Sequence, residues 1–242
     1  MQAPPGQRIL SVWLPNWPIR RRKRCGVWPA ENQNATPQPC ATVETRQGQR
    51  RIEAACDIAA AQGITPGQML SQARALCPGL QIDEANPEAD LRGLIALAHW
   101  CERLSPLTSP DPPDGLWIDI TGCAHLQGGE ARLADRLQQR LSPCRLAIAD
   151  TAGAAWALAR AATRNTAEIV PQGQHANRIA ALPIGLLRLD TRIVAGLQRV
   201  GLRSVEALRR IPRAELAARF GPSPSLQLDR ALGLQPEPII WS

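Results

Sequence analysis

The chain has 242 residues, 44% of them hydrophobic, enough to bury a core in one large domain or in two to three small ones. Its 28 Lys and Arg exceed its 21 Asp and Glu, and the net charge of +7 favours an anionic partner, although a soluble protein without one can be equally basic. No apolar run approaches the roughly 20 residues of a membrane span, and the first, residues 9–14, is too short for a signal peptide. We therefore expect a cytoplasmic protein that does not enter membranes.

The spacing of cysteine and histidine argues against a metal centre. The three histidines are isolated from one another, and no two of the seven cysteines lie at CxxC spacing. An odd number of scattered cysteines also argues against a disulfide framework. We expect neither a structural metal nor another cofactor.

The first half of the chain predicts a strand followed by an insertion. Residues 9–14 form an apolar strand, and the five cations behind it, with the proline-punctuated stretch that follows, predict a polar loop. Residues 40–45 and 49–55 flank Gln47 and Gly48 and predict a β-hairpin. Two helices broken at 63–66 and a strand over 80–86 come next.

The second half alternates between helices and strands up to about residue 168. Helices are predicted over 87–105, 129–142 and 151–163, and strands over 115–123 and 144–150. This order is typical of an α+β domain that carries a small domain inserted after its first strand. Beyond residue 168 the pattern predicts only short helices.

The C-terminal helices contain an arginine-rich motif. The stretch LQRVGLRSVEAL reads as a helix, a turn at Gly201 and a second helix capped by Ser204. Such helix-hairpin-helix units present backbone N–H groups and a helix N-terminus to DNA phosphates without reading sequence. The alternative is a glycine-stopped helix pair that packs on itself.

The segment DPPDGLWIDITGCAHL carries three acids next to an alternating strand. Asp111, Asp114 and Asp119 could be metal-binding carboxylates for two-metal phosphoryl transfer. Alternatively, Asp114 caps a turn after two prolines and Asp119 faces solvent or a structural partner.

Taken in chain order, the predicted elements and these motifs resemble the palm, fingers and thumb of a Y-family (UmuC-like) translesion DNA polymerase of the ImuB type. GLWIDITGCAHLQGGE and AIADTAGAAWALAR carry the resemblance most clearly. It implies an α+β multidomain fold: a mixed-sheet palm with flanking helices (1–18 and 76–167), small inserted fingers (19–75) and an all-helical thumb with the helix-hairpin-helix (168–235). Residues 236–242 would begin the linker to a little-finger domain that this chain does not include.

The resemblance implies that the metal-binding acids are lost. The family's Asp-Met-Asp falls on Trp13, Leu14 and Pro15, and its second acidic pair falls on Asp114 and Gly115. Two Mg²⁺ ions need several carboxylates, which one surviving acid cannot supply. We therefore expect no catalytic residue here and no bound metal, with Trp13 lying near Asp114 in the space where metals would sit.

The triphosphate contacts are missing from the corresponding positions as well. The Tyr and Arg that grip the triphosphate in the family fall on Asp57 and Ala60, and the Asn-Lys pair of a later palm helix falls on Thr151 and Ala152. The aromatic that gates the sugar falls on Pro18.

Three functions remain open. The first is a catalytically inactive homologue that binds DNA and acts as a scaffold or adaptor subunit in damage-induced (SOS) translesion synthesis. The resemblance then implies an ImuA-type RecA-like protein, an error-prone polymerase III alpha subunit and the sliding clamp as partners, although no clamp-binding segment is visible. The second is an active, divergent nucleotidyltransferase with Mg²⁺ on Asp111, Asp114 and Asp119. The third is a DNA-binding module with no role in damage.

Two basic regions are candidate DNA contacts. Thumbs of the family carry Gly-x-Gly where this chain has Arg188-Leu189-Asp190, so a side-chain contact from Arg188 would have to replace a backbone one. The residues expected to contact DNA are Arg188, Arg192, Arg199, Gly201, Arg203 and Ser204. The second-ranked patch consists of Arg20, Arg21, Arg22, Lys23 and Arg24.

Overall fold

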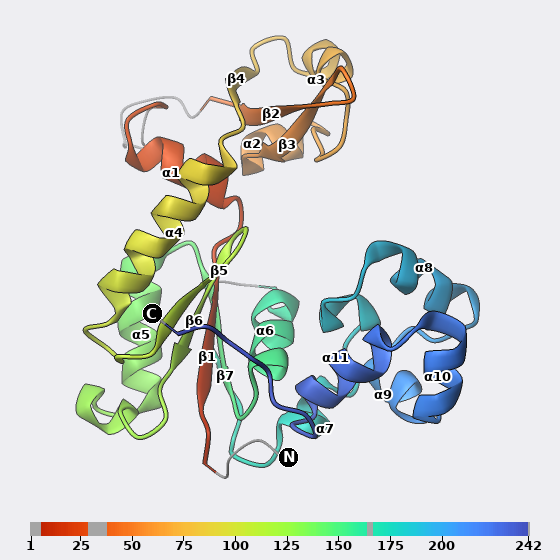
Figure 1. Ribbon diagram of the computed structural model, residues 1–242. Coiled ribbons are helices and arrows are strands. Elements are labelled where there is room, and N and C mark those ends of the chain that lie inside the picture. The colour runs from red at the N-terminus through yellow and green to blue at the C-terminus, as the bar shows by residue number, and fades with distance from the viewer. Residues whose placement is uncertain (1–5, 29–37, 164–166, 242) are drawn as a thin grey trace. The chain divides into compact units, whose positions relative to one another are not determined.

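The computed structural model describes residues 6–28, 38–163 and 167–241 (Figure 1). The chain divides into two compact units. The first, here called the sheet unit, comprises Met1–Leu14, Leu97–Asp111 and Gly115–Ser242. The second, the inserted unit, comprises Pro15–Ala96 and Pro112–Asp114. In the part of the chain that the structure describes, every helix is too short or too polar to cross a bilayer.

The sheet unit is built on a five-stranded sheet in the order β5-β6-β1-β7-β8. Its strands are β1 (Ile9–Trp13), β5 (Thr108–Asp111), β6 (Gly115–Asp119), β7 (Arg145–Ala149) and β8 (Ala167–Ile169). The central strand, β1, pairs antiparallel with both β6 and β7. The edge strands β5 and β8 were not expected, because four and three residues are too few to establish an alternating pattern.

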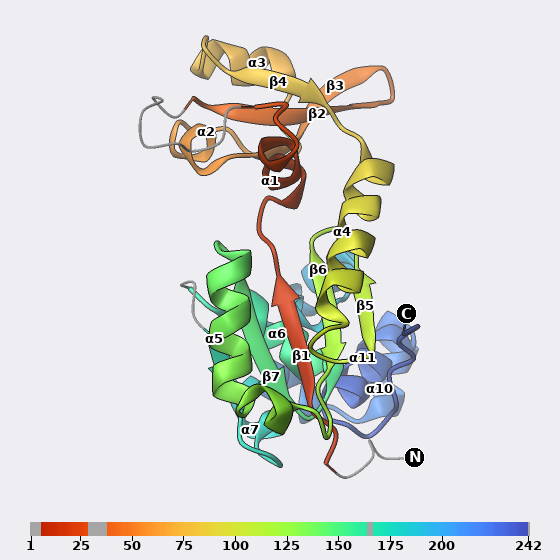
Figure 2. The ribbon, with the colours of Figure 1, turned by 90° about the vertical axis from the view of Figure 1, so that its left-hand side faces the viewer.

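Two helices cover opposite faces of this sheet, α5 (Glu130–Leu141) and α6 (Ala152–Ala161), with a short 3₁₀ turn, η1 (Ala124–Gln127), before α5 (Figures 1 and 2). Helix α5 is amphipathic and buries Leu133, Leu137 and Leu141 on one side. Helix α6 consists largely of alanine, which allows it to lie close to β1 and β7.

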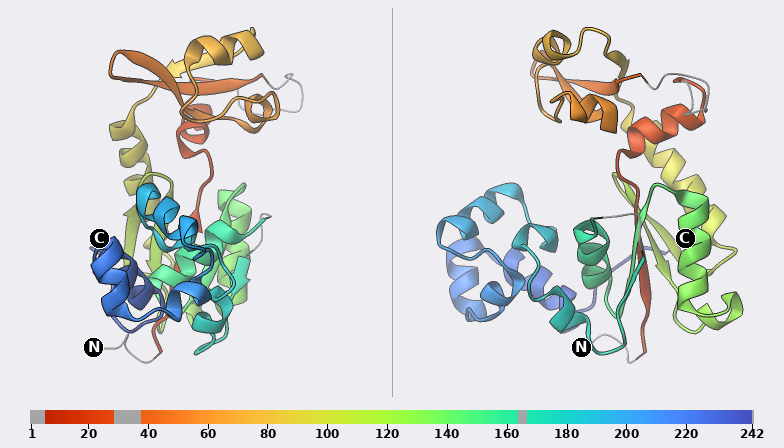
Figure 3. Two further views of the ribbon diagram at one scale, coloured as in Figure 1. Left: turned by 90° about the vertical axis from the view of Figure 1, so that its right-hand side faces the viewer. Right: turned by 180° about the vertical axis from the view of Figure 1, so that it is seen from behind.

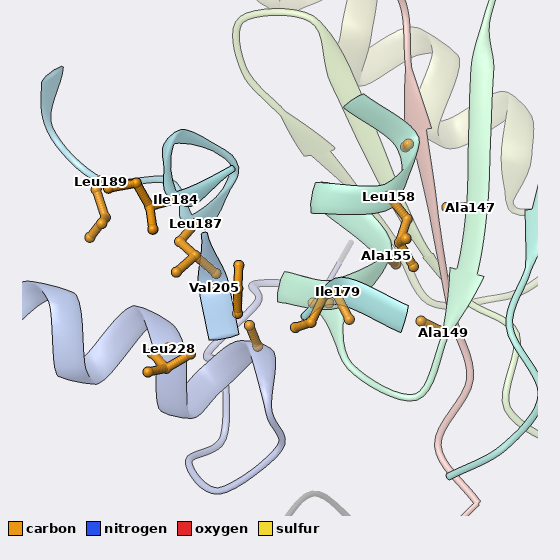
Figure 4. Packing of buried hydrophobic residues seen from close by; sticks show 14 of the residues in the cluster. Ala147, Ala149, Ala155, Leu158, Ile179, Ile184, Leu187, Leu189, Val205 and Leu228 are labelled. Atoms are coloured by element: carbon orange, nitrogen blue, oxygen red, sulfur yellow. The ribbon is translucent and has the colours of Figure 1, made fainter. Parts of the chain in front are cut away.

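The C-terminal part of the sheet unit is helical: α7 (His175–Ile179), η2 (Ile184–Leu187), α8 (Thr191–Arg199), α9 (Val205–Arg209), α10 (Arg213–Phe220) and α11 (Ser223–Ala231). It shares one hydrophobic core with α6, and this core includes Leu158, Ile179 and Leu187 (Figure 4). A side chain at Gly153 would place its Cβ 2.9 Å from the Cα of Ala231, so this glycine lets α11 approach α6 closely.

The inserted unit holds a three-stranded sheet in the order β3-β2-β4, seen from two further sides in Figure 3. Its elements are α1 (Trp17–Arg24), β2 (Cys40–Arg46), β3 (Gln49–Ala55), α2 (Asp57–Ala61), α3 (Leu70–Leu76), β4 (Gln81–Glu84) and the part of α4 (Pro87–Cys101) up to Ala96. The hairpin of β2 and β3 turns at Gln47 and Gly48, as predicted. However, β4 pairs in parallel with β2, so the expected boundary near residue 75 is too early; the inserted unit continues to Ala96.

The expected loop at the basic run is wrong, because these residues form helix α1. Arg22 is 1% exposed, and its guanidinium donates to Asp83 at 2.6 Å and to the backbone oxygen of Pro18 at 3.0 Å. Arg21 pairs with Asp90 at 2.5 Å. These acids lie about sixty residues or more further along the chain, so local sequence could not reveal that Arg21 and Arg22 are engaged. Most of the proline-punctuated stretch behind α1, residues 29–37, lies outside the described residues.

Candidate functional site

The end of β1 is the position at which the resemblance places the metal-binding acids. The register sets Trp13 opposite Gly115 on one side and opposite Arg145 on the other. Asp114 directly precedes Gly115, the residue that pairs with Trp13 on β6. The Arg145 guanidinium lies 4.7 Å from the centre of the Trp13 ring.

Gly115 has no room for a side chain. An added Cβ would lie 2.9 Å from Asp111 Oδ2, 3.1 Å from the backbone oxygen of Val12 and 3.2 Å from that of Asp111. Two of these atoms belong to the backbone of the same sheet and cannot move independently of it. The position of the second acid of the family's pair is therefore sterically closed as well as uncharged.

The three acids of the alternative metal site do not converge. Asp111 Oδ2 accepts a hydrogen bond from Arg160 at 3.3 Å. Asp119 lies opposite Ile9, four residues along β6 from Gly115, which corresponds to about 13 Å of strand. Its Oδ1 accepts from the backbone N–H of Thr121. Across the described ranges, no three His, Cys, Asp or Glu side chains are grouped so as to hold a metal ion, so these residues do not fit the two Mg²⁺ of an active polymerase.

Arginines and tryptophans from five chain segments gather on the α6 side of the sheet. Arg160 lies 3.8 Å from the centre of the Trp156 ring and 5.7 Å from that of Trp13. Arg188 lies 5.6 Å from the Trp117 ring and 5.8 Å from the Trp156 ring. We call this set the Trp–Arg cluster; its members are Trp13, Trp117, Trp156, Arg145, Arg160 and Arg188. Such cation–π contacts are worth about 2 kcal/mol when desolvated.

Of this cluster, sequence reasoning identified only Trp13 and Arg188 as site residues. Trp156 and Arg160 lie one helical turn apart on α6, which is a weak local signal for a shared face. Nothing local connects them to Trp117 or Arg188. Their proximity depends on how α6 and the C-terminal helices pack on the sheet.

Arg188 adopts a backbone conformation that normally belongs to glycine. Its φ of 55° is left-handed, at the place where the resemblance expects the first glycine of Gly-x-Gly. Holding a residue other than glycine there costs about 1–2 kcal/mol. Its side chain is 22% exposed and pairs with Glu237. Burial lowers the pKa of the Arg188 guanidinium, and the nearby Arg230 and Arg160 lower it further, against the opposite effect of Asp111.

The predicted helix, glycine turn and helix are present around residue 201. Helix α8 ends at Arg199, Gly201 turns with a φ of 84°, and α9 begins after Ser204. The Ser204 hydroxyl caps α9 by accepting from the backbone N–H of Ala207 at 3.2 Å. Arg199 and Arg203, on either side of the turn, are exposed, as is Arg192 at the start of α8. This arrangement presents cations next to a helix N-terminus.

The positions that correspond to the triphosphate grip carry no cation. Asp57 opens α2 and accepts from the Asn16 side chain at 3.2 Å, while Ala60 lies within that helix. The Thr151 hydroxyl caps α6 and donates to the backbone oxygen of Ala231 at 2.9 Å. Ala152 is buried at the first turn of α6. Thr151 thus serves to join α6 to α11.

A buried charge network that sequence reasoning missed lies at the other end of β1. Arg8, 5% exposed, donates to Glu130 at 2.6 Å, to Asp150 at 2.7 Å and to the backbone oxygen of Val170 at 2.7 Å. Asp150 also accepts from His175 at 2.9 Å. Burial alone would raise the pKa of Asp150, but hydrogen bonds from the Gly173 backbone, Arg8 and His175 outweigh it and lower the pKa. The network ties β1 to α5, β7 and α7.

Solved structures with the same fold are Y-family DNA polymerases. The crystal structure of DinB from Sulfolobus solfataricus matches 96% of this chain and 68% of its own, with a TM-score of 0.76 and 12% identity. An insertion ternary complex of Dbh DNA polymerase matches 96% of this chain and 69% of its own, with a TM-score of 0.73 and 14% identity. At such identities the likeness shows the fold, with a palm-like mixed sheet and helices.

Sequence identity to curated proteins indicates the family more closely than the fold does. Protein ImuB of Caulobacter vibrioides is 46% identical over 183 residues, 74% of this chain and 40% of that protein. DNA polymerase IV of Dehalococcoides mccartyi is 25% identical over 187 residues, 73% of this chain and 47% of that protein. The chain thus spans less than half the length of these relatives. The model of the impB/mucB/samB family matches residues 30–163, and the chain belongs to that family.

Proposed function

We propose that this chain is the core of a catalytically inactive Y-family polymerase homologue, which binds DNA and serves as a scaffold subunit in error-prone translesion synthesis. The observation that carries the proposal is the Trp–Arg cluster at the end of β1, where an active site of this family needs carboxylates. The 46% identity to an ImuB protein supports the same assignment.

Charge is the physical reason for inactivity. The cluster brings together three guanidinium groups; that of Arg160 pairs with Asp111 and that of Arg188 pairs with Glu237. Divalent cations would meet repulsion there, and Asp111 is already engaged by Arg160. The closed space at Gly115 removes the remaining option for a metal-binding acid.

Primer extension tests this part of the proposal. We expect no template-dependent incorporation with Mg²⁺ or Mn²⁺, because the carboxylates and the triphosphate grip are absent. The competing function, an active polymerase that uses the retained Asp114, predicts extension that disappears in Asp114→Ala. That result would overturn the inactive scaffold.

We further propose that the C-terminal helices act as a thumb, with the α8–α9 turn as the helix-hairpin-helix that holds DNA. The exposed Arg192, Arg199 and Arg203 surround this turn, whereas Arg209 on α9 and Arg210 directly after it pair with Glu206. Contacts to phosphate carry no base information, so the proposed binding is independent of sequence. The inserted unit would correspond to the fingers.

The salt dependence of DNA binding measures the number of contacts between these arginines and phosphates. The double variant Arg199→Gln/Arg203→Gln is expected to flatten the slope of log K against log salt by nearly 2 on duplex DNA, because each phosphate contact contributes about 0.9. The control is Arg20→Gln/Arg24→Gln, which removes the same charge from α1 and spares the buried Arg22. The opposite result would place the DNA site on α1: the α8–α9 variant binds DNA as tightly as wild type across the salt series, and the control binds DNA more weakly.

The proposed partners follow from the ImuB likeness: DNA, an ImuA-type RecA-like protein, an error-prone polymerase III alpha subunit and the sliding clamp, all in the cytoplasm. Because the chain spans 40% of its ImuB relative, these partners can bind regions that correspond to none of its residues. Co-purification of the tagged chain with each candidate partner would test each contact separately.

A further inference from the structure

The segment Gln235–Trp241, here called the strap, follows α11 and packs back onto the sheet unit. Ile239 and Trp241 lie against the core shared by α6 and the C-terminal helices, while Ile240 is 89% exposed. The strap has no helix or strand of its own. Beyond the hydrogen bond from the Gln235 N–H to the backbone oxygen of Asp229, its contacts can be exchanged without breaking secondary structure.

Glu237 anchors the strap inside a cationic environment. One carboxylate oxygen pairs with Arg188, and the other, Oε2, is buried without a hydrogen-bond partner. The side chain of Glu237 is only 10% exposed. Nearby, Nε of Arg230 is also buried without a partner. Glu237 and Arg230 both line a small cavity of about 110 Å³ beside Thr151.

The positive charges around Arg188 favour an anion beside its guanidinium group. Arg160 and Arg230 both act on Arg188 with the same sign of charge, and Asp111 opposes them. Asp111 is itself engaged by Arg160. Glu237 forms the ion pair with Arg188, and its removal would leave a site with excess positive charge and an unused donor on Arg230.

We propose that Glu237 is an internal counter-ion that occupies a phosphate site built by Arg188 and Arg230, and that a phosphate of the DNA backbone replaces it when the strap lifts. This inference rests on the proposed DNA binding. It explains why the glycine position of the turn carries an arginine despite its left-handed backbone: the side chain provides a contact that Glu237 masks. The strap then lowers DNA affinity in proportion to the fraction of molecules in which it is closed.

The test compares Glu237→Gln with Glu215→Gln, a matched removal of one negative charge from an exposed position on α10. We expect Glu237→Gln to bind duplex DNA about fivefold more tightly than Glu215→Gln. We also expect a salt slope steeper by about 0.9, because one more phosphate is contacted. The further variant Arg188→Gln/Glu237→Gln should lose both gains, and thermal melting of each variant establishes that it is folded.

The outcomes separate this inference from the proposed function. Equal DNA binding by Glu237→Gln and Glu215→Gln, with a wild-type chain that binds DNA, would overturn the phosphate site alone. Absence of DNA binding in wild type and in every variant would overturn the DNA-binding function itself. Inorganic triphosphate is the second probe; if only its binding improves in Glu237→Gln, the DNA backbone is the wrong source of the phosphate.

Discussion

Replacing Arg8 with methionine is expected to lower the free energy of unfolding by about 3–5 kcal/mol. The substitution keeps most of the side-chain volume but removes the guanidinium that Glu130 and Asp150 share. Two partly buried carboxylates would then face each other without their cation, and the backbone oxygen of Val170 would lose its donor. Urea unfolding at pH 7 measures the change. The control Arg140→Met, at an exposed position on α5, should stay within about 0.5 kcal/mol of wild type.

The pH dependence of this effect has a definite sign. The folded-state pKa of Asp150 is lowered, so its contribution to stability is present above its ordinary pKa near 4 and is lost as the pH falls through the lower folded value. In Arg8→Met, the pKa of Asp150 rises because one of its three donors is gone. The stability gap between wild type and variant should therefore narrow on acidification below about pH 4. A gap that widens there would contradict this account of Asp150.

Introducing an acid as Gly115→Glu is expected to destabilise the fold without producing polymerase activity. The added Cβ alone meets the backbone oxygens of Val12 and Asp111, and overpacking of this kind costs about 1–3 kcal/mol. Even in molecules that fold, Trp13 and the guanidinium groups beside it leave no set of carboxylates for two metals. Thermal unfolding and primer extension on the same preparation measure both effects.

Gly115→Ala separates the steric cost from the charge. It should already show most of the destabilisation, whereas Gly185→Ala should show none, because the nearest atom to its added Cβ lies 3.9 Å away and its backbone is not left-handed. If Gly115→Ala were as stable as wild type, the closed space at this position would not be the reason for the missing acid. Template-dependent extension by Gly115→Glu would mean that a single carboxylate was the only missing element.

The sequence by itself determined those features whose signal is local. The apolar run 9–14, the hairpin turn at Gln47 and Gly48, and the capped turn at Gly201 each depend on neighbouring residues, and all three lie where they were predicted. The absence of acids at Trp13 and Gly115 is likewise readable, because it concerns residue identity at aligned positions. None of these statements needs knowledge of which segments meet in space.

Only the tertiary structure decided what the charged residues do. The run 20–24 looked like a solvated loop because the acids that neutralise Arg21 and Arg22 come from β4 and α4. Arg188 looked like a free phosphate contact because its partner, Glu237, follows α11. An arginine on its own is compatible with solvent, with a phosphate or with a buried carboxylate. The free energy of burying it depends on partners that folding brings from elsewhere in the chain, so local sequence cannot decide among the three.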